Sequence, residues 1–477
     1  MKLNELTILE AIEGLKTSKF TSVELTKACF DQIKKHDLEI KAFVTLCESQ
    51  ALNDAAEADK LIKVSGVDIF NSKPLLGVPY ACKDNFNTNG IETTASSNVL
   101  KGYIPPYEST VTSKLKDAGA ILIGKTNMDA FAHGSSTETS DFFTTRNPWD
   151  TSRVPGGSSG GSGAAVASNM CIFALGSETA GSIRCPASWC GVTGFKPSYG
   201  RVSRYGLIAM ASSTDQAGPI AKNIEDCALV MEIIAGKDPK DATSSNTPVE
   251  KYLEEAKSAN SLKGVRIGKP KSYFDIDLEP GVKKSIEDAI IIFENLGAEI
   301  VEIDLLDPKY SIAVYTILQR SEVSSNLARL DGIRYGHDRQ SFGFEAKKRM
   351  MLGAYTLSSG YYDAYYSKAQ KVRTLIVEDF NKAFEKVDMI VGPTMPCSAL
   401  KIGESEKSSM FGEIMDVLTE PSSIAGVTAL NLPCGFDENG LPIGVQLIGQ
   451  QFDEVKIFKA ASVFQKNTDF HKKFPLA

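Results

Sequence analysis

The sequence has few histidines. Only His36, His133, His337 and His471 occur among 477 residues, none adjoins the serine- and glycine-rich clusters at 156–163 and 178–184, and no HExxH pattern is present. A Ser-His-Asp arrangement therefore has no histidine near it in the sequence, although distant residues can meet in space. Hydrolysis by a histidine-held metal ion is not favoured either.

Long apolar runs and a surplus of positive charge are also missing. No segment approaches the roughly 20 apolar residues of a membrane-spanning helix, and the N-terminus carries acidic residues within a helical pattern, unlike a signal peptide. The chain has 52 Lys and Arg against 59 Asp and Glu, a net charge of −7, and no basic stripe. We therefore expect a soluble, cytoplasmic protein that does not itself bind nucleic acid.

The cysteines lack the spacing of a disulfide framework. There are nine, an odd number, in a long chain, which favours reduced thiols and a cytoplasmic setting. Cys185 and Cys190 are the closest pair, but no second pair or histidine lies near them to complete a zinc site. We expect mostly buried thiols and no metal.

Apolar segments of strand length alternate with amphipathic helical patterns, which predicts an α/β sheet with crossover connections. Strands are predicted at 40–47, 75–82, 120–124, 171–176, 265–270, 298–303 and 388–393, with a final strand pair around the turn DENG. Helices are predicted at 7–17, 22–36, 48–64, 109–119 and 281–296, with a long helical tract at 309–386. Residues 235–262 are polar and are interpreted as a surface excursion.

One segment, residues 155–187, is rich in glycine and serine. It reads PGGSSGGSGAAVASNMCIFALGSETAGSIRCPA and holds two clusters, at 156–163 and 178–184. A flexible linker is the alternative, but the first cluster runs directly into a small-residue helix pattern and a buried-strand pattern. Serines beside closely approaching backbone are the first candidates for a nucleophile.

Lysine is the remaining strong base. Lys83 follows an apolar strand, where burial would lower its pKa and let it accept a proton near neutrality. The alternative, a surface ion pair with Asp84, is equally compatible with the sequence. The formal phosphate-loop match GAILIGKT at 119–126 is a poor nucleotide site, because the residues between its glycines form a strand.

Three blocks resemble the amidase signature family. They are PLLGVPYACKDNFNTNG (74–90), RVPGGSSGGSGAAVA (153–167) and GSETAGSIRCPASWCGVTGFKPSYGRVSRYGL (176–207), in the family's order and at similar intervals. Further segments, among them FAHGSSTETS (131–140), SSNLARLDGIRYG (324–336) and GLPIGVQLIG (440–449), are similar to the glutaminase subunits of tRNA-dependent amidotransferases. The resemblance implies an α/β amidase signature fold in a single domain over 1–477. Its large mixed β-sheet would be covered by helices on both faces, with a helical N-terminal segment over about 1–65.

The resemblance also implies a catalytic triad. Ser182 would attack the side-chain amide of glutamine. Ser158, held by a cis Gly157–Ser158 peptide, would relay protons, and a neutral Lys83 would be the terminal base. A serine hydroxyl needs such a positioned base, because it is a weak nucleophile by itself.

Two further sets of residues follow from the same resemblance. The backbone N–H groups at Thr179, Ala180 and Gly181, with that of Ser182, would form the oxyanion hole; here the chain reads Glu-Thr-Ala-Gly where Asp-Thr-Gly-Gly is typical of the family. The substrate-binding residues would be Tyr315, Arg349 and Asp416. Arg349 would bind the α-carboxylate of glutamine, Asp416 its α-ammonium, and Tyr315 would line the pocket. From the sequence alone, a charge on a helix surface is the better explanation of Arg349.

The implied function is hydrolysis of glutamine to supply ammonia for the conversion of Glu-tRNA(Gln) to Gln-tRNA(Gln). The resemblance implies two partners, the amidotransferase subunits B and C. Ammonia would pass to the first, which uses ATP and Mg²⁺, and the second, a small protein, would brace the pair. Misacylated tRNA would be bound by the complex, and Asp-tRNA(Asn) is a further possible acceptor. This chain itself would need no metal or cofactor. The alternatives are a free-standing amidase acting on another small amide, and a non-catalytic scaffold.

Overall fold

A large mixed β-sheet organises the chain. Across the residues that the computed structural model describes, 2–332, 337–408 and 410–475, the sheet has 11 strands in the order β1-β3-β2-β4-β6-β5-β10-β11-β9-β7-β8. The pairs β2–β3, β2–β4, β7–β8 and β7–β9 are parallel and the others antiparallel. The strands are β1 (Phe43–Leu46), β2 (Pro79–Lys83), β3 (Ile121–Thr126), β4 (Phe173–Glu178), β5 (Thr193–Lys196), β6 (Gln216–Ala221), β7 (Arg266–Pro270), β8 (Glu299–Ile303), β9 (Met389–Pro393), β10 (Thr428–Phe436) and β11 (Pro442–Gly449).

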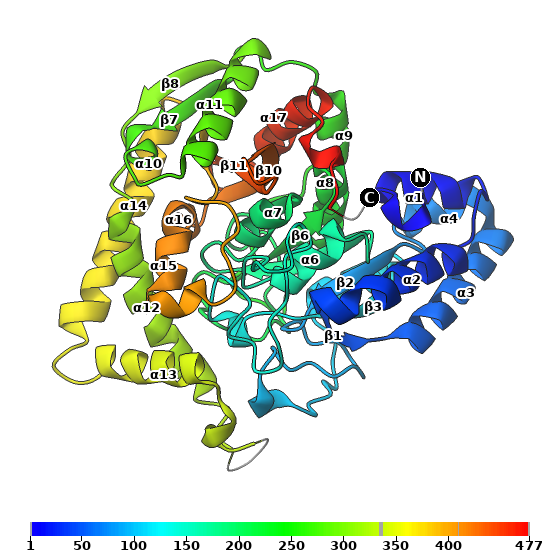
Figure 1. The fold of residues 1–477 in the computed structure, drawn as a ribbon, viewed down its shortest axis with the longest axis horizontal. Coiled ribbons are helices and arrows are strands. Elements are labelled where there is room, and N and C mark those ends of the chain that lie inside the picture. Colours follow the sequence, from blue (N-terminus) through cyan, green and yellow to red (C-terminus); the bar gives the residue numbers. More distant parts are fainter. Residues whose placement is uncertain (1, 333–336, 409, 476–477) are drawn as a thin grey trace.

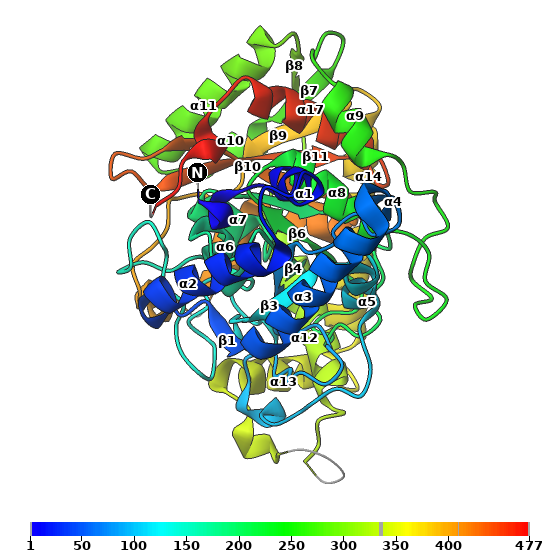
Figure 2. The same cartoon turned by 90° about the vertical axis from the view of Figure 1, so that its right-hand side faces the viewer.

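Helices surround this sheet (Figures 1 and 2). Figure 1 shows α1 to α4 at one end of the molecule and α12 to α14 at the other. The helices are α1 (Ile8–Lys16), α2 (Ser22–Ile40), α3 (Glu48–Ser65), α4 (Ile69–Ser72), α5 (Thr110–Asp117), α6 (Gly160–Ala167), α7 (Arg184–Cys190), α8 (Ile224–Ile234), α9 (Tyr252–Ser258), α10 (Lys271–Phe274), α11 (Pro280–Asn295), α12 (Lys309–Leu327), α13 (Phe344–Thr356), α14 (Lys368–Phe384), α15 (Phe411–Met415), α16 (Glu420–Ala425) and α17 (Glu454–Lys466). In the described parts of the chain, none of these is long and apolar enough to cross a bilayer.

The central strand β5 shows that helices cover both faces of the sheet. A Cβ atom on Gly194 would lie 2.6 Å from the Cβ of Ala187 in α7. The next residue, Phe195, stacks on Phe458 of α17 with ring centroids 4.3 Å apart. Neighbouring residues of a strand point to opposite faces, so α7 and α17 lie on opposite sides. The predicted helix-covered mixed sheet is confirmed.

Local sequence signals place the N-terminal helices correctly. Thr21 is the N-cap of α2, its side chain accepts a hydrogen bond from the N–H of Glu24, and the Glu24 carboxylate accepts from the N–H of Thr21 at 2.7 Å. This reciprocal capping box satisfies backbone donors that the first helical turn leaves unpaired. The segment GAILIGKT contains β3, as its apolar pattern predicts.

The helical tract predicted at 309–386 is not continuous. The tract divides into α12, α13 and α14, and residues 333–336 lie outside the described residues. Gly332 and Gly360, in the connections that follow α12 and α13, have φ of +65° and +88°, a left-handed conformation that a continuous right-handed helix does not contain. The division lets α13 turn back and pack on α12.

The interpretation of residues 235–262 as a surface excursion is wrong over its second half. Residues 252–258 form α9, which packs against α8 and α17. Tyr252 is buried and its ring lies 5.2 Å from that of Phe458, centroid to centroid. Tertiary contact with a distant helix, rather than local composition, decides this element.

Candidate active site

Lys83 is the last residue of β2, a strand that lies parallel to β4. Because parallel neighbours end at the same edge of a sheet, the Lys83 side chain meets the end of β4. Its Nζ is 2.7 Å from the Ser158 hydroxyl, to which it is hydrogen-bonded, and donates to the Ser177 carbonyl oxygen at 3.0 Å. Lys83 and Ser158 are thus in direct contact, as the resemblance implies.

The environment of Lys83 suits a proton acceptor. The side chain is completely buried, and this desolvation lowers its pKa from the usual 10.5 to about 7, although the negative charges of Asp129, Asp215 and Glu178 oppose the shift. The alternative of a surface pair with Asp84 is wrong, since Asp84 instead faces Lys125, with the charged atoms 3.7 Å apart. A lysine with this pKa is substantially uncharged at neutral pH.

The glycine- and serine-rich segment is part of the core. Every residue from 154 to 198 is buried, so the flexible-linker alternative is wrong. The Gly157–Ser158 peptide is cis. The N–H of Ser159 donates to the carbonyl oxygen of Ser182 at 3.1 Å. The loops that carry Ser158 and Ser182 therefore lie side by side.

Ser182 lies between the end of β4 and the start of α7, in a loop held by a buried ion pair. The Glu178 carboxylate accepts hydrogen bonds from the N–H groups of Ile183 and Arg184, at 2.9 and 3.1 Å, and from the Arg184 guanidinium. That guanidinium also donates to the carbonyl oxygen of Ala180 at 2.8 Å. The side chains of Glu178 and Arg184 are fully buried. The pair fixes the backbone on either side of Ser182.

The backbone before Ser182 presents unused donors. Among the described residues, the N–H groups of Thr179, Ala180 and Gly181 have no backbone or side-chain acceptor. Ala180 is not one of the residues with positive φ, so its Cβ causes no backbone strain. The departure from the family pattern at this position therefore requires no unusual backbone conformation. The three N–H groups are available to an oxyanion, which is the role predicted for them.

A small cavity lies at Ser182, and we call it the catalytic cavity. The predicted substrate-binding residues Tyr315, Arg349 and Asp416 all line it. They come from α12, α13 and the turn after α15, which gather on one side of the molecule (Figure 1). Arg349 is buried, so its interpretation as a helix-surface charge is wrong. The fold brings together residues more than 100 positions apart in the sequence.

Of the three substrate-binding residues predicted here, Arg349 and Asp416 have polar atoms without a partner in the described part of the chain. The Arg349 Nε donates to Glu345 at 2.8 Å, whereas its two terminal nitrogens have no acceptor among the described residues. Asp416 accepts from the Ser135 hydroxyl at 2.7 Å through Oδ2, and its Oδ1 has no partner. Burial raises the pKa of Asp416 to about 8, although the Ser135 hydrogen bond opposes this shift. The Tyr315 hydroxyl shares a 2.8 Å hydrogen bond with Thr179.

Comparison with known proteins assigns the chain to a family. The sequence model of the amidase family matches residues 24–458. The chain belongs to the amidase family. A relative from Carboxydothermus hydrogenoformans, named as the A subunit of glutamyl-tRNA(Gln) amidotransferase, is 49% identical over 490 residues, with 100% of both chains covered. The protein of the same name from Caldanaerobacter subterraneus is 50% identical, over 99% of this chain and 98% of its own.

A solved structure supports the same assignment of this amidase. The crystal structure of the glutamyl-tRNA(Gln) amidotransferase A subunit from Thermotoga maritima is 40% identical in sequence and superposes with a TM-score of 0.84. The match covers 100% of this chain and 98% of that one. Both the mixed sheet and its helical cover are therefore those of a known amidase fold.

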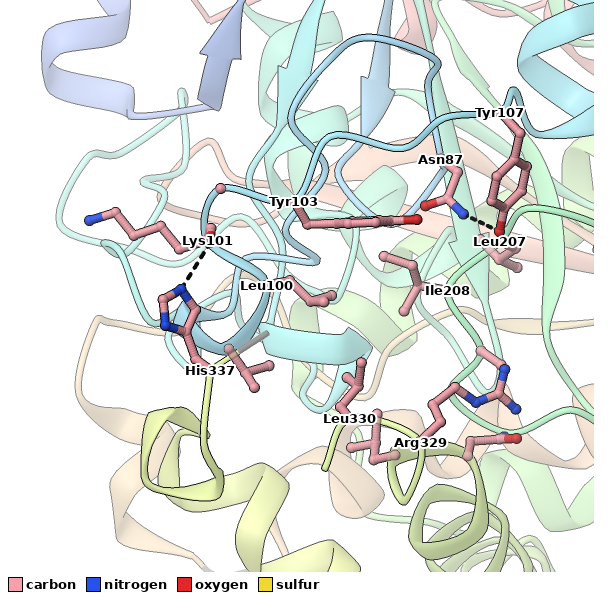
Figure 3. Close-up of a pocket in the computed structure, with 15 residues that line it drawn as sticks. Asn87, Leu100, Lys101, Tyr103, Tyr107, Leu207, Ile208, Arg329, Leu330 and His337 are labelled. Atoms are coloured by element: carbon pink, nitrogen blue, oxygen red, sulfur yellow. Dashed lines mark hydrogen bonds between the residues drawn. The ribbon is translucent and has the colours of Figure 1, made fainter. Parts of the chain in front are cut away.

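A separate cavity of this amidase, of about 660 Å³, lies beside α12 (Figure 3). It is lined by Tyr103, Arg329 and His337 among others, and no serine or cysteine is found among its described lining residues. The Asn326 side chain donates to the carbonyl oxygen of Met210 at 2.9 Å. Met210 lines the catalytic cavity, so this contact lies between the two cavities. The catalytic cavity holds the candidate nucleophile and is the candidate active site.

Several residues that support the candidate site of this amidase escaped sequence reasoning. Asp129 is buried near Lys83 and accepts hydrogen bonds from the N–H of Thr137 and the hydroxyl of Thr139, at 2.9 Å each. Ser135 binds Asp416, as described above. Nothing in the local sequence marks Asp129 or Ser135. Arg184, in contrast, belongs to the ETAGSIR cluster, and an arginine in an otherwise apolar, buried segment was a usable signal for a buried partner.

The described residues contain no group of three or more His, Cys, Asp or Glu side chains placed to hold a metal ion. The nine cysteines are unpaired thiols, and Cys185 and Cys190 are both buried in α7. The residues that surround Ser182 instead offer hydroxyl, amine, carboxylate and guanidinium groups. These groups suit an amidase that uses a serine nucleophile.

Proposed function

We propose that this chain is the glutaminase subunit of a tRNA-dependent amidotransferase. The observation that carries the proposal is the completely buried Lys83, hydrogen-bonded to Ser158 beside the loop of Ser182, at a cavity lined by Arg349 and Asp416. The relatives named as the A subunit of glutamyl-tRNA(Gln) amidotransferase match over the whole length of the chain. The chemistry of this site fits a small amide that carries both a carboxylate and an ammonium group.

The proposed reaction begins with removal of a proton from Ser182. Its hydroxyl proton passes to the Ser158 oxygen as the Ser158 proton passes to the neutral Lys83 amine. The freed Ser182 oxygen forms a bond to the side-chain amide carbon of glutamine, and the N–H groups at 179–182 stabilise the resulting oxyanion. Lys83 returns the proton, by way of Ser158, to the leaving nitrogen. The C–N bond breaks, ammonia departs, and water then hydrolyses the glutamyl ester to glutamate.

The proposed substrate contacts use the free groups of the catalytic cavity. The two terminal nitrogens of Arg349 suit a bidentate contact with the α-carboxylate. The unpartnered Oδ1 of Asp416 suits the α-ammonium, whose positive charge would favour the ionised carboxylate. Tyr315 closes the side of the cavity toward Thr179.

The partners belong to the same proposal. Ammonia released here would serve a B subunit that binds ATP and Mg²⁺ and amidates Glu-tRNA(Gln) or Asp-tRNA(Asn), with a small C subunit bracing the pair. The tRNA would be bound by the complex rather than by this chain. The proposed reaction needs no cofactor, because each step uses only side chains and backbone groups of the protein, and water.

A trapping experiment tests the proposal. The chain, purified alone and with candidate subunits B and C, is incubated with an electrophilic glutamine analogue, and the modified peptide is identified by mass spectrometry. We expect modification at Ser182, prevented by excess glutamine. Modification elsewhere would refute the assignment. Hydrolysis of unrelated amides at a rate that neither partner changes would favour a free-standing amidase instead. Absence of any amide hydrolysis with the partners present would favour a scaffold.

Replacing Asp416 by asparagine tests the ammonium contact. The side chain keeps its shape but cannot become an anion, so a charge-assisted hydrogen bond is lost. We expect KM for glutamine to rise about 10- to 100-fold with a much smaller change in kcat, measured by ammonia release. An unchanged KM would place the α-ammonium elsewhere.

Replacing Gly181 by alanine tests how closely Asp416 packs on the nucleophile loop. The added Cβ would lie 2.4 Å from Asp416 Oδ1 and 2.5 Å from Thr419 Oγ1, so one side must move. Because small displacements of reacting groups are costly, we expect kcat/KM to fall by about 100-fold. Gly281→Ala is the matched control, since its Cβ would meet no atom closer than 3.5 Å; equal activity of the two variants would contradict the prediction.

A further inference from the structure

An outer cavity of about 490 Å³ adjoins the catalytic cavity. Both are lined by Ser135, Arg349 and Glu413. The outer cavity extends between the loop that follows Ala130–Ala132, the start of α13 and the segment around α15. Arg349 therefore lies at the wall that the two cavities share.

His133 lines the outer cavity in an unusual state. It is completely buried, and neither ring nitrogen has a hydrogen-bond partner. Buried polar groups in proteins are nearly always paired. An unpaired imidazole at a cavity wall is therefore a candidate to bond a ligand in that cavity. The burial of His133 and the positive charges of Arg349 and Arg320 lower its pKa well below the usual value, so the ring is neutral, with one N–H donor and one acceptor nitrogen.

Arg349 is a cationic neighbour of this ring, and both residues line the outer cavity. Glu345 occupies its Nε, at 2.8 Å, and leaves the two terminal nitrogens for a ligand. A carboxylate on those nitrogens has four lone-pair sites, and a guanidinium edge uses only two of them. A second donor on the same side can use a third. In the described structure His133 is an unpaired donor that lines the cavity shared with Arg349.

We propose that His133 is a further substrate-binding residue, whose ring N–H donates to the α-carboxylate held by Arg349. The inference rests on the proposed function and deepens it, because it makes the outer cavity part of the recognition of an α-amino acid. It predicts that the enzyme discriminates strongly for amides that carry this carboxylate.

Two substrates separate this role from a structural one. Glutamine carries the α-carboxylate, and 4-aminobutanamide is the same molecule without it. In His133→Leu we expect KM for glutamine to rise about 10- to 100-fold, kcat to change little, and kcat/KM for 4-aminobutanamide to stay at the wild-type value. His133→Asn, which keeps an N–H donor, should recover part of the glutamine affinity. His36→Leu, on α2 away from the site, is the control and should match the wild type.

Binding and stability measurements complete the test. Calorimetric titration of glutamine into Ser182→Ala, with and without His133→Leu, should show the same loss of affinity without turnover. Equal losses with both substrates, or a lower melting temperature with an unchanged KM, would show that His133 is structural and overturn the proposal. If the wild type hydrolyses other amides but not glutamine, the proposed function itself fails. If glutamine is hydrolysed normally by His133→Leu, only the role of His133 fails.

Discussion

Ser182→Ala is expected to abolish glutamine-dependent amidation while leaving ammonia-dependent amidation intact. The substitution removes only the hydroxyl that would form the bond to the amide carbon. Removing a serine nucleophile from a hydrolase triad lowers kcat by roughly 10⁴-fold or more. The Ser182 carbonyl oxygen, which accepts from Ser159, is unaffected, so the loop should keep its structure. The measurement is amidated tRNA formed by the reconstituted complex, with glutamine or with ammonium chloride as the nitrogen donor.

Ser168→Ala is the matched control for this prediction. Ser168 is also buried, immediately after α6, and its hydroxyl has no hydrogen-bond partner. We expect wild-type activity with either nitrogen donor. If Ser182→Ala also retains its glutamine-dependent activity, the nucleophile is another residue; if it loses both activities, Ser182 maintains the complex rather than the chemistry.

Lys83→Met is expected to be nearly as damaging. Methionine fills the buried space but cannot accept a proton, so the Ser158 hydroxyl loses its acceptor. Because members of a triad act as a unit, we expect glutaminase activity to fall by roughly 10⁴-fold. Lys83→Arg should be no better, since a guanidinium stays protonated at all accessible pH values. Ammonia-dependent amidation by the complex should persist in both variants.

The pH dependence of the wild type follows from the same residue. Burial lowers the pKa of Lys83 to about 7. The uncharged amine, which is the form that accepts a proton, predominates at pH values above this pKa. The kcat/KM for glutamine should therefore rise with pH through about 7, and further through about 8, where Asp416 ionises, because kcat/KM reports the groups of the free enzyme. Lys222→Met is the control, because Lys222 is also buried with a pKa lowered to about 8, but its Nζ donates to the backbone of Asn4 and Leu6. It should keep the wild-type profile, and a profile that is flat through pH 7 would contradict the role of Lys83.

Local patterns predicted much of the fold. The period-2 and apolar-run segments predicted β1, β3, β7, β8 and β9 within a few residues, and the amphipathic patterns at 7–17 and 22–36 predicted α1 and most of α2. These signals succeed because they depend on neighbours in the chain. The breaks in the helical tract at 309–386 were not predicted, because a helix-forming composition continues across Gly360. The conformation of Gly360 depends on how α13 and α14 pack, which the local sequence does not show.

The residues of the candidate site also fall into two groups, those that the sequence predicted and those that it did not. The resemblance brought the nine predicted residues together as a set, and the structure gathers them around one cavity or against it. Asp129 and His133 were not recognised as parts of the site, because a single buried carboxylate or imidazole has no sequence pattern of its own. Asp129 is placed by hydrogen bonds from its own loop, such as that from Thr137, and His133 lies at a cavity that α13 also lines.

The sequence by itself determined the residue types of the site, their order along the chain, the strand that ends in Lys83, and the family. Only the tertiary structure decided that Lys83 is fully buried and bonded to Ser158 rather than paired with Asp84, and that Arg349 faces a cavity rather than solvent. The physical reason is that the pKa of a side chain and the direction in which it points depend on desolvation and packing by segments far away in the chain. A local pattern of residues contains no information about where those distant segments pack.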